Sequence, residues 1–468
     1  MALTIEQNPL YTINPVGQEV IFTSLDAATV STYFKVKYIA QVHISETDID
    51  LATSTAIGTF KTTPNNAGAG IFDFRPIVES YVNSDNLGAL GSEYKGTATS
   101  ALLPNPLHLI DKFSLNDNVV RYLKIRFKVE GSTTATGNTA IVGASADSDQ
   151  FTLINGYLKH TDLLNTFNGD FGYDTQVFNL NEVVLSGDIP ASYLTNAPLT
   201  QYANESDYGT ISFISTEVGT DGILDRMIVT YYNSSGSVLT EEDIPNTDAN
   251  GGFTTFTTAT KNQLIHFGCY PANLRNWSTN FDTLLANGTL DYYTVVAENS
   301  AGNTITEILR VNLLCPTLKG YEPIRLTWLN QWGVWDYYTF TMKSTKSIST
   351  KGSTYQQLAG TWNESIYQPN GYRGGKKAFR VNATEKISMN TDFVNEAESE
   401  WFEELINSPE VYILEGFQTD PSFSSLNNYV TPARLTTSNL TKKTVANDKL
   451  IQYTFEVEKS KTLRTQSI

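Results

Sequence analysis

The chain contains 468 residues, of which 40% are hydrophobic, 12% aromatic and only 17% charged. Its length predicts two to four domains, and this polar but weakly charged composition favours turn-rich β structure over helices. The formal net charge of −17 opposes nonspecific binding to nucleic acid or anionic lipid, and suits solubility or docking against a more basic protein.

Cysteine content and hydropathy indicate neither a disulfide-rich protein nor a membrane-spanning one. Cys269 and Cys315 are the only cysteines, too few for a disulfide scaffold and without metal-binding spacing; whether they pair stays open. The first residues, MALTIEQNPLYTINP, lack the basic and apolar regions of a signal peptide, so none is expected. No run of about 18 apolar residues occurs, so no membrane span is expected.

Residues 1–150 are predicted to form a β-sandwich-like domain. Apolar and polar side chains alternate from Phe34 to Ile44 and from Leu123 to Val129, which indicates two half-buried strands. His43 falls on the polar side of the first strand, so we expect it to be exposed. The small, polar stretch from Gly131 to Asp149 predicts a long loop near the domain boundary.

Residues 151–318 carry a second set of strand patterns. Side chains alternate from Met227 to Tyr232 before a turn, and the pattern Tyr-x-Val-x-Ala-x-Asn-x-Ala-Gly spans Tyr293 to Gly302. This pattern resembles the penultimate strand and following turn of fibronectin type III and related immunoglobulin-like sandwiches. The resemblance covers about 25 residues and implies a β domain in which Tyr293, or its neighbour Tyr292, anchors a corner by hydrogen bonding to backbone.

An aromatic hairpin opens the last segment, residues 319–468. Leu326 to Met342 read LTWLNQWGVWDYYTFTM, with a turn expected over residues 330–333. A half-solvated strand would leave one face polar, and neither face of this hairpin is polar. We therefore expect it to be covered both by its own domain and by another molecule. The predicted interface residues here are Trp328, Trp332, Trp335, Tyr337 and Tyr338.

A polar, basic loop is predicted after the hairpin. It carries Arg373, Lys376, Lys377 and Arg380. In a chain of net charge −17 these cations are expected to meet an acidic patch on a neighbouring copy, with phosphate contact as the alternative.

One amphipathic helix is expected next. Asn395 with Glu398 forms a capping-box pattern, Trp401 and Leu405 mark an apolar stripe, and Ser408-Pro409 ends the helix. Its acidic side chains are the predicted acidic patch, or otherwise a solvated face. They are Glu396, Glu398, Glu400, Glu403 and Glu404. Strands at 411–414, 431–436 and 450–458 complete an α+β domain, so the whole chain is predicted to be mainly β.

Catalytic and metal-binding patterns are weak. No HExxH, Gly-x-Ser-x-Gly or phosphate-binding loop occurs, and His266 and Cys269 would face opposite sides of a strand. The pairs Asp48/Asp50 and Asp147/Asp149 lack the further ligands of an EF-hand, so calcium binding stays open. Three carboxylates near aromatic residues are the weak candidates for glycoside hydrolysis, namely Asp336, Glu298 and Glu364. We expect no enzyme activity and no cofactor.

The last segment is similar to uncharacterised virion proteins of tailed phages that infect Bacteroidetes, including crAss-like phages. The residues that carry the similarity are Trp328, Leu329, Asn330, Gly333, Trp335, Asp336, Tyr337, Phe340, Ser408, Pro409, Val411 and Tyr453. The resemblance implies a structural virion protein of the neck, tail or baseplate, arranged in a sixfold or twelvefold ring of identical copies beside other virion proteins. DNA would pass through its lumen without specific binding.

Two other functions stay open. Exposed aromatics in loops, such as Trp362 and Tyr367, would suit a carbohydrate-binding adhesin or receptor-binding module, and a secreted glycoside hydrolase ranks third. Neither the virion part, the ring symmetry nor the neighbouring proteins follow from the sequence.

Overall fold

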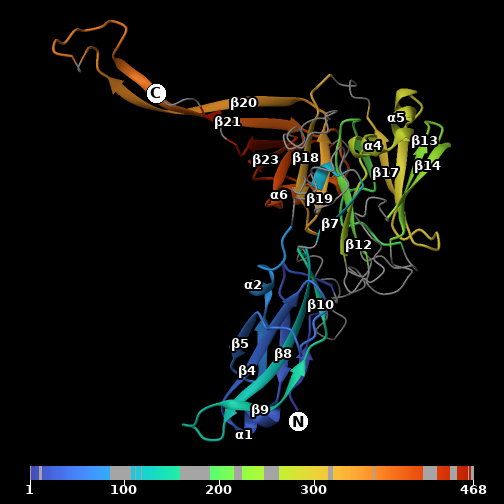
Figure 1. Ribbon diagram of the computed structural model, residues 1–468, viewed down its shortest axis with the longest axis vertical. Coiled ribbons are helices and arrows are strands. Elements are labelled where there is room, and N and C mark those ends of the chain that lie inside the picture. Colours follow the sequence, from blue (N-terminus) through green and yellow to red (C-terminus); the bar gives the residue numbers. More distant parts are fainter. Residues whose placement is uncertain are drawn as a thin grey trace. The chain divides into compact units, whose positions relative to one another are not determined.

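The protein is mainly β, as predicted: strands account for 49% and helices for 12% of a computed structural model (Figure 1). The structure describes residues 2–9, 13–84, 107–110, 112–116, 119–158, 190–215, 224–246, 263–314, 320–361, 364–414, 429–442, 451–461 and 463–464. Two compact units result. Unit 1 comprises Met1–Leu314, Leu329–Asp336 and Phe417–Asn427, and unit 2 comprises Cys315–Trp328, Tyr337–Gly416 and Asn428–Ile468.

The N-terminal part of unit 1 is built from two sheets with a common apolar core. The first has the order β1 (Thr4–Gln7), β3 (Ile21–Leu25), β6 (Ala69–Asp73). The second has the order β2 (Ile13–Pro15), β10 (Phe151–Ile154), β8 (Val120–Ser132), β4 (Phe34–Ser45), β5 (Gly58–Thr62), with β9 (Ala140–Asp147) also paired to β8. Short helices α1 (Ala27–Thr32) and α2 (Arg75–Val78) follow β3 and β6. Phe22 and Phe72 of the first sheet pack against Phe127 of the second, so the arrangement is a sandwich.

Two sequence predictions for this part need correction. The expected loop over residues 131–149 is half strand, because β9 pairs with β8 across a bulge. His43 is buried rather than exposed, because Ile49, Leu51 and Ser54 of the following loop fold over its side of β4 together with Tyr122.

The rest of unit 1 also has two sheets. One has the order β11 (Thr200–Ala203), β17 (Leu309–Leu313), β16 (Tyr292–Glu298), β13 (Arg226–Tyr232), β14 (Val238–Pro245). The other has the order β12 (Thr210–Ser215), β15 (Gln263–Gly268), β7 (Phe113–Asn116). Helices α4 (Pro271–Trp277) and α5 (Thr279–Ala286) follow β15, and a 3-10 turn, η2 (Leu107–Leu109), precedes β7.

The corner predicted from the fibronectin-like motif is confirmed. The buried Tyr293 hydroxyl donates a hydrogen bond of 2.8 Å to the Cys269 carbonyl oxygen, whereas Tyr292 stacks on Tyr232 beneath the Arg310 guanidinium. The turn after β16 is closed by Asn299, whose side-chain oxygen accepts from the backbone N–H groups of Ala301 and Asn303.

Strands cross the boundary predicted at residue 150. β10, which follows that boundary, pairs with β8 and β2, and β7, which precedes it, pairs with β15. The boundary predicted at residue 318 falls at 315–319, outside the described residues.

Unit 2 contains most of an eight-stranded sheet and one helix. The order is β19 (Trp335–Phe340), β18 (Ile324–Leu329), β22 (Val411–Leu414), β23 (Val430–Leu435), β24 (Thr454–Lys459), β21 (Gly375–Asn390), β20 (Ser344–Gln357), with β25 (Leu463–Arg464) also on β21. Helix α6 (Glu396–Asn407) carries the predicted capping box of Asn395 and Glu398 and ends at Ser408. Phe402 of α6 packs on Trp328, Phe340 and Phe455 of the sheet, which confirms an α+β arrangement.

Candidate assembly surface

The hairpin aromatics are covered by the chain itself. Trp328 is 0% exposed, and Trp332, Trp335 and Tyr337 are also buried, while Tyr338 is half-buried. The expectation that this hairpin needs a second copy to cover it is therefore wrong, because side chains remote in sequence pack on it. We do not propose these five residues as an interface.

The tip of the hairpin lies in the core of unit 1. Asn330 forms the predicted turn: its side-chain oxygen accepts from the backbone N–H groups of Trp332 and Val334, and Gly333 adopts a φ of +74°. Trp332 belongs to an apolar cluster with Leu194 and Ile214, and its indole N–H donates to Asn196. The rings of Trp335 and His108 form a T-shaped pair with centroids 5.0 Å apart.

The base of the hairpin is buried within unit 2. The Trp328 ring centroid lies 4.9 Å from that of Trp401, and Tyr338 lies 4.9 Å from Phe402. The Arg325 guanidinium lies over the Tyr337 ring at 5.2 Å and donates to Thr339. These rings stabilise the fold rather than a surface.

The acidic patch expected on α6 is only partly available. Glu404 is buried, so its predicted interface role is wrong. Glu403 forms an ion pair of 2.6 Å with Lys442, and Glu398 is occupied by the capping box, where burial raises its pKa. Glu400 is exposed. The buried side of α6 includes Glu404 because the helix lies with Trp401 and Leu405 against the sheet.

The expected basic loop is instead a long β-hairpin. Strands β20 and β21 pair in register from Ser344↔Met389 to Gln357↔Gly375, so Lys376, Lys377 and Arg380 lie on β21, and Arg373 precedes it. β21 pairs with β24 only over Lys386–Asn390. The remaining residues, 348–385, are called the arm here; in Figure 1 β20 and β21 extend beyond the other strands of unit 2.

The arm exposes an unusual share of apolar side chains. Six of the 17 exposed large hydrophobic side chains of the described chain lie on its 38 residues, and Tyr372 is 77% exposed. The six are Ile348, Leu358, Ile366, Tyr367, Tyr372 and Phe379. Scattered single exposed apolar residues are ordinary, but six of them on one hairpin make the arm a candidate binding surface.

The arm is also basic. Five Lys or Arg and two Glu residues give it a formal charge of +3, so the rest of the chain carries −20. Lys376 and Lys377 make no ion pair with any residue that the structure describes. The basic residues were predicted from the sequence, and so was the exposure of Tyr367, which is 58% exposed; the other five exposed apolar residues were not predicted. Their signal is weak because they are spread among Ser, Thr and Gln without a regular period.

The end of the arm is shaped by two glycines. Gly374 and Gly375 both have positive φ, of +95° and +80°, and a Cβ at Gly374 would contact Ala359. The Arg373 guanidinium lies 5.7 Å from the ring of Tyr372, and Tyr355 meets Phe379 across the strands. Trp362 lies outside the described residues.

His43 and His266 each lie within hydrogen-bonding distance of a serine hydroxyl. His43 Nδ1 lies 2.8 Å from the Ser54 hydroxyl, and burial together with the Arg126 guanidinium lowers its pKa. His266 Nδ1 lies 2.7 Å from the hydroxyl of Ser212, its partner on β12, and burial lowers its pKa to about 3. This Ser–His pair is closed to solvent, so no substrate reaches it. His160 and Cys315 lie outside the described residues.

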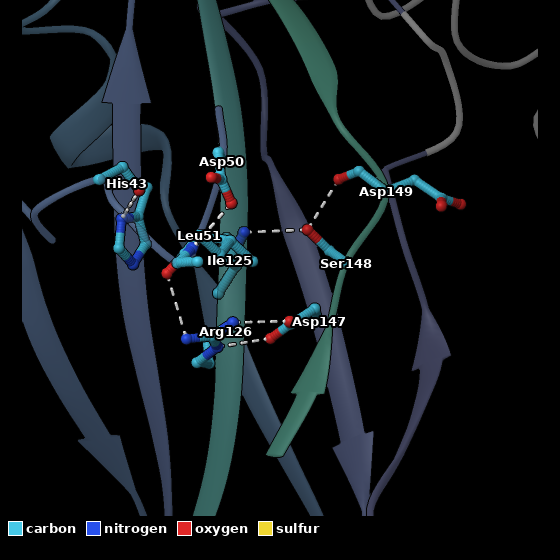
Figure 2. A network of polar contacts seen from close by, with 10 residues as sticks. His43, Asp50, Leu51, Ile125, Arg126, Asp147, Ser148 and Asp149 are labelled. Carbon is cyan, nitrogen blue, oxygen red and sulfur yellow. Dashed lines mark hydrogen bonds and ion pairs between the residues drawn. The ribbon is translucent and has the colours of Figure 1, made fainter. Parts of the chain in front are cut away.

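Asp48, Asp50 and Asp147 accept local hydrogen bonds, whereas the carboxylate of Asp149 points away from this network (Figure 2). Arg126 donates to both carboxylate oxygens of Asp147, at 2.7 and 2.9 Å, and to the Leu51 carbonyl, which lowers the pKa of Asp147. Asp50 accepts from a backbone N–H of its own turn, and Asp48 accepts from Gln150. Within the described ranges no group of three or more acidic, His or Cys side chains is suited to hold a metal ion.

Two of the three carboxylates considered for glycoside hydrolysis have structural roles. Asp336 is buried and accepts from Thr195 and Asn330, whereas Glu298 is held by Arg226 at 2.8 Å. Glu364 is exposed on the arm.

Comparison with known proteins gives no family. No family model matches the chain, and no curated protein matches it. One similar solved structure is the native conformation of Escherichia coli alpha-2-macroglobulin, with 9% identity and a TM-score of 0.12, covering 98% of this chain and 40% of that chain. This similarity is too low to support any conclusion. Among the described helices, none is long and apolar enough to cross a membrane.

Proposed function

We propose that this chain is a structural protein of a tailed-phage virion, a self-assembling component of the neck, tail or baseplate. The observation that carries the proposal is the arm: a two-stranded hairpin that is basic, rich in exposed apolar side chains and attached to an acidic body. Isolated two-stranded hairpins are marginally stable in water, so such an arm is expected to be covered in its working state. The similarity of the last segment to phage virion proteins supplies the biological setting.

A ring is the assembly that suits this chain. An arm and the surface that receives it are two different patches, so contacts between identical copies are heterologous and close into a ring when the rotation permits. Other virion proteins and passing DNA are further proposed neighbours, and an acidic body would repel the DNA.

Negative-stain electron microscopy of the purified full chain tests this proposal. We expect rings for the wild-type protein. Lys351 and Asn382 are directly opposite on the two strands, so replacing Gly352–Val381 by an Asn-Gly turn removes the outer arm while keeping the pairings to β24 and β25. This variant is expected to stay monomeric with an unchanged far-ultraviolet circular dichroism spectrum. A wild-type chain that stays monomeric at high concentration would refute the proposal.

A carbohydrate-binding module is the second candidate, because Tyr367 and Tyr372 are exposed near the end of the arm. Aromatic rings in such positions stack on sugars. Glycan-array binding by monomeric protein, abolished by Tyr372→Ala with folding intact, would favour this function over assembly.

A further inference from the structure

Two strand edges of this molecule are complementary in charge. The outer edge of β21 over Gly375–Val381, here the basic edge, contains Lys376, Lys377 and Arg380, a net charge of +3. The outer edge of β14, Val238–Pro245, here the acidic edge, contains Glu241, Glu242 and Asp243, a net charge of −3. The two edges are seven and eight residues long, lengths over which two strands pair.

The basic edge is open on one side. Residues 375–381 pair with β20 on their inner side, and the strands β24 and β25 meet β21 only beyond residue 381. Phe379 on this edge is exposed, and Lys376 is exposed as well. Its backbone N–H and C=O groups are therefore available to a further strand, as far as the structure describes the chain.

The acidic edge is open in the same sense. β14 is the last strand of its sheet and pairs only with β13 among the described strands. Glu241 and Asp243 are two residues apart and exposed, and Val238 is exposed as well. Glu241 accepts a hydrogen bond from Thr230, and Asp243 lies 3.8 Å from the Arg226 guanidinium, a longer contact than the 2.7 Å between Asp147 and Arg126. Glu242 points to the other side, where it accepts hydrogen bonds from Tyr231, Ser278 and Asn280, so it is not part of the exposed charge.

Three other edge strands, β5, β9 and β11, fit a basic strand less well. β5 carries Lys61, β11 carries no charge, and the single acid of β9, Asp147, is paired with Arg126. On α6, Glu404 is buried, Glu403 forms an ion pair with Lys442, and Glu398 takes part in the capping box. Glu396 and Glu400 are exposed, but they lie on a helix and offer no strand edge. β14 alone, among these, combines a run of acids with an open edge.

We propose that the arm of one copy adds as an extra strand along β14 of the next copy, basic edge on acidic edge. The proposal rests on the self-assembly proposed above and names its interface. Backbone hydrogen bonds supply affinity in such strand addition, and facing opposite charges select the partner and register. Because one copy uses β21 and the other β14, each copy offers one free edge of each kind.

Charge reversal tests the pairing in the full chain. Variant A carries Lys376→Glu, Lys377→Glu and Arg380→Glu; variant B carries Glu241→Lys and Asp243→Lys. Glu242 is left intact because its internal hydrogen bonds support the fold. The matched control reverses three exposed lysines elsewhere, Lys37, Lys343 and Lys461, with the same change of net charge as variant A. Assembly is measured by sedimentation velocity at low ionic strength.

We expect the wild type and the control to assemble, and variants A and B each to dissociate at concentrations at least tenfold higher than the wild type. An equimolar mixture of A and B is expected to assemble, because each edge of A then meets an edge of opposite charge on B. If variants A and B each assembled on their own as the wild type does, the proposed interface would be wrong and the proposed function would stand. The same conclusion would follow if variant A lost assembly and variant B kept it. A monomeric wild type would overturn both.

Discussion

Truncation of Trp328 separates a core role from an interface role. Its ring is 0% exposed and lies against Trp401 and Phe402 of α6. A buried tryptophan removes about 200 Å² from water, which at about 25 cal/mol per Å² contributes about 5 kcal/mol. Truncations of buried aromatic rings cost about 3–5 kcal/mol. We therefore expect Trp328→Ala to lower the free energy of unfolding of unit 2 by about 4 kcal/mol.

Urea unfolding followed by far-ultraviolet circular dichroism measures this change. Trp328→Phe is the matched variant: the indole N–H makes no hydrogen bond within the described chain, so phenylalanine removes an unsatisfied donor and keeps most of the ring. Trp328→Phe should lower the free energy of unfolding by about 1–2 kcal/mol. Tyr372→Ala, on the exposed arm, should lower it by less than about 0.5 kcal/mol. If Trp328→Ala cost under about 1 kcal/mol yet abolished assembly, a second copy rather than α6 would cover the ring.

Three further predictions concern the turn, the cap and a buried histidine. Gly333→Ala should cost at least about 3 kcal/mol in thermal unfolding, because φ is +74° and the new Cβ would overlap the Asn155 carbonyl oxygen; a cost below about 1 kcal/mol would contradict this geometry. Asn395→Ala removes the capping box of α6 and should cost about 1–2 kcal/mol, most of it regained in Asn395→Ser. The pKa of His266, about 3 in the fold, lies below the unfolded value of about 6.5, so its contribution to stability is complete above pH 6.5 and is lost as the pH falls toward 3. Between pH 7 and pH 5 the free energy of unfolding of the wild type should therefore fall by about 2 kcal/mol more than that of His266→Asn. Parallel pH dependences of the unfolding free energy in the two proteins would refute the claim that burial lowers this pKa.

Features set by neighbouring residues were predictable from the sequence. The capping box needs only Asn395 and Glu398, and the hairpin turn needs only Asn330 to Gly333, so local chemistry determines both. The Tyr293 corner was also found, because a motif in the strand itself marks it.

Features set by distant residues were not predictable. Periodicity places His43 on a polar face, but it cannot show that the loop carrying Leu51 and Ser54 folds over that face. Likewise, the hairpin rings were predicted to need cover from a second molecule because their partners within the chain, such as His108 and Trp401, lie far away in the sequence. An apolar face predicts that something covers it, and not whether that partner belongs to the same chain.

The arm was missed for the opposite reason. Alternation of apolar and polar side chains arises when one face of a strand is buried and the other is solvated. Nearly all of β20 is exposed on both faces. Its sequence, STKSISTKGSTYQQ, therefore shows no alternation of apolar and polar residues. A ribbon that is exposed on both faces, yet holds six large apolar side chains, lacks the contacts that stabilise strands in water. The exposed apolar side chains of the arm, rather than the buried tryptophans, are therefore the ones that a partner would cover.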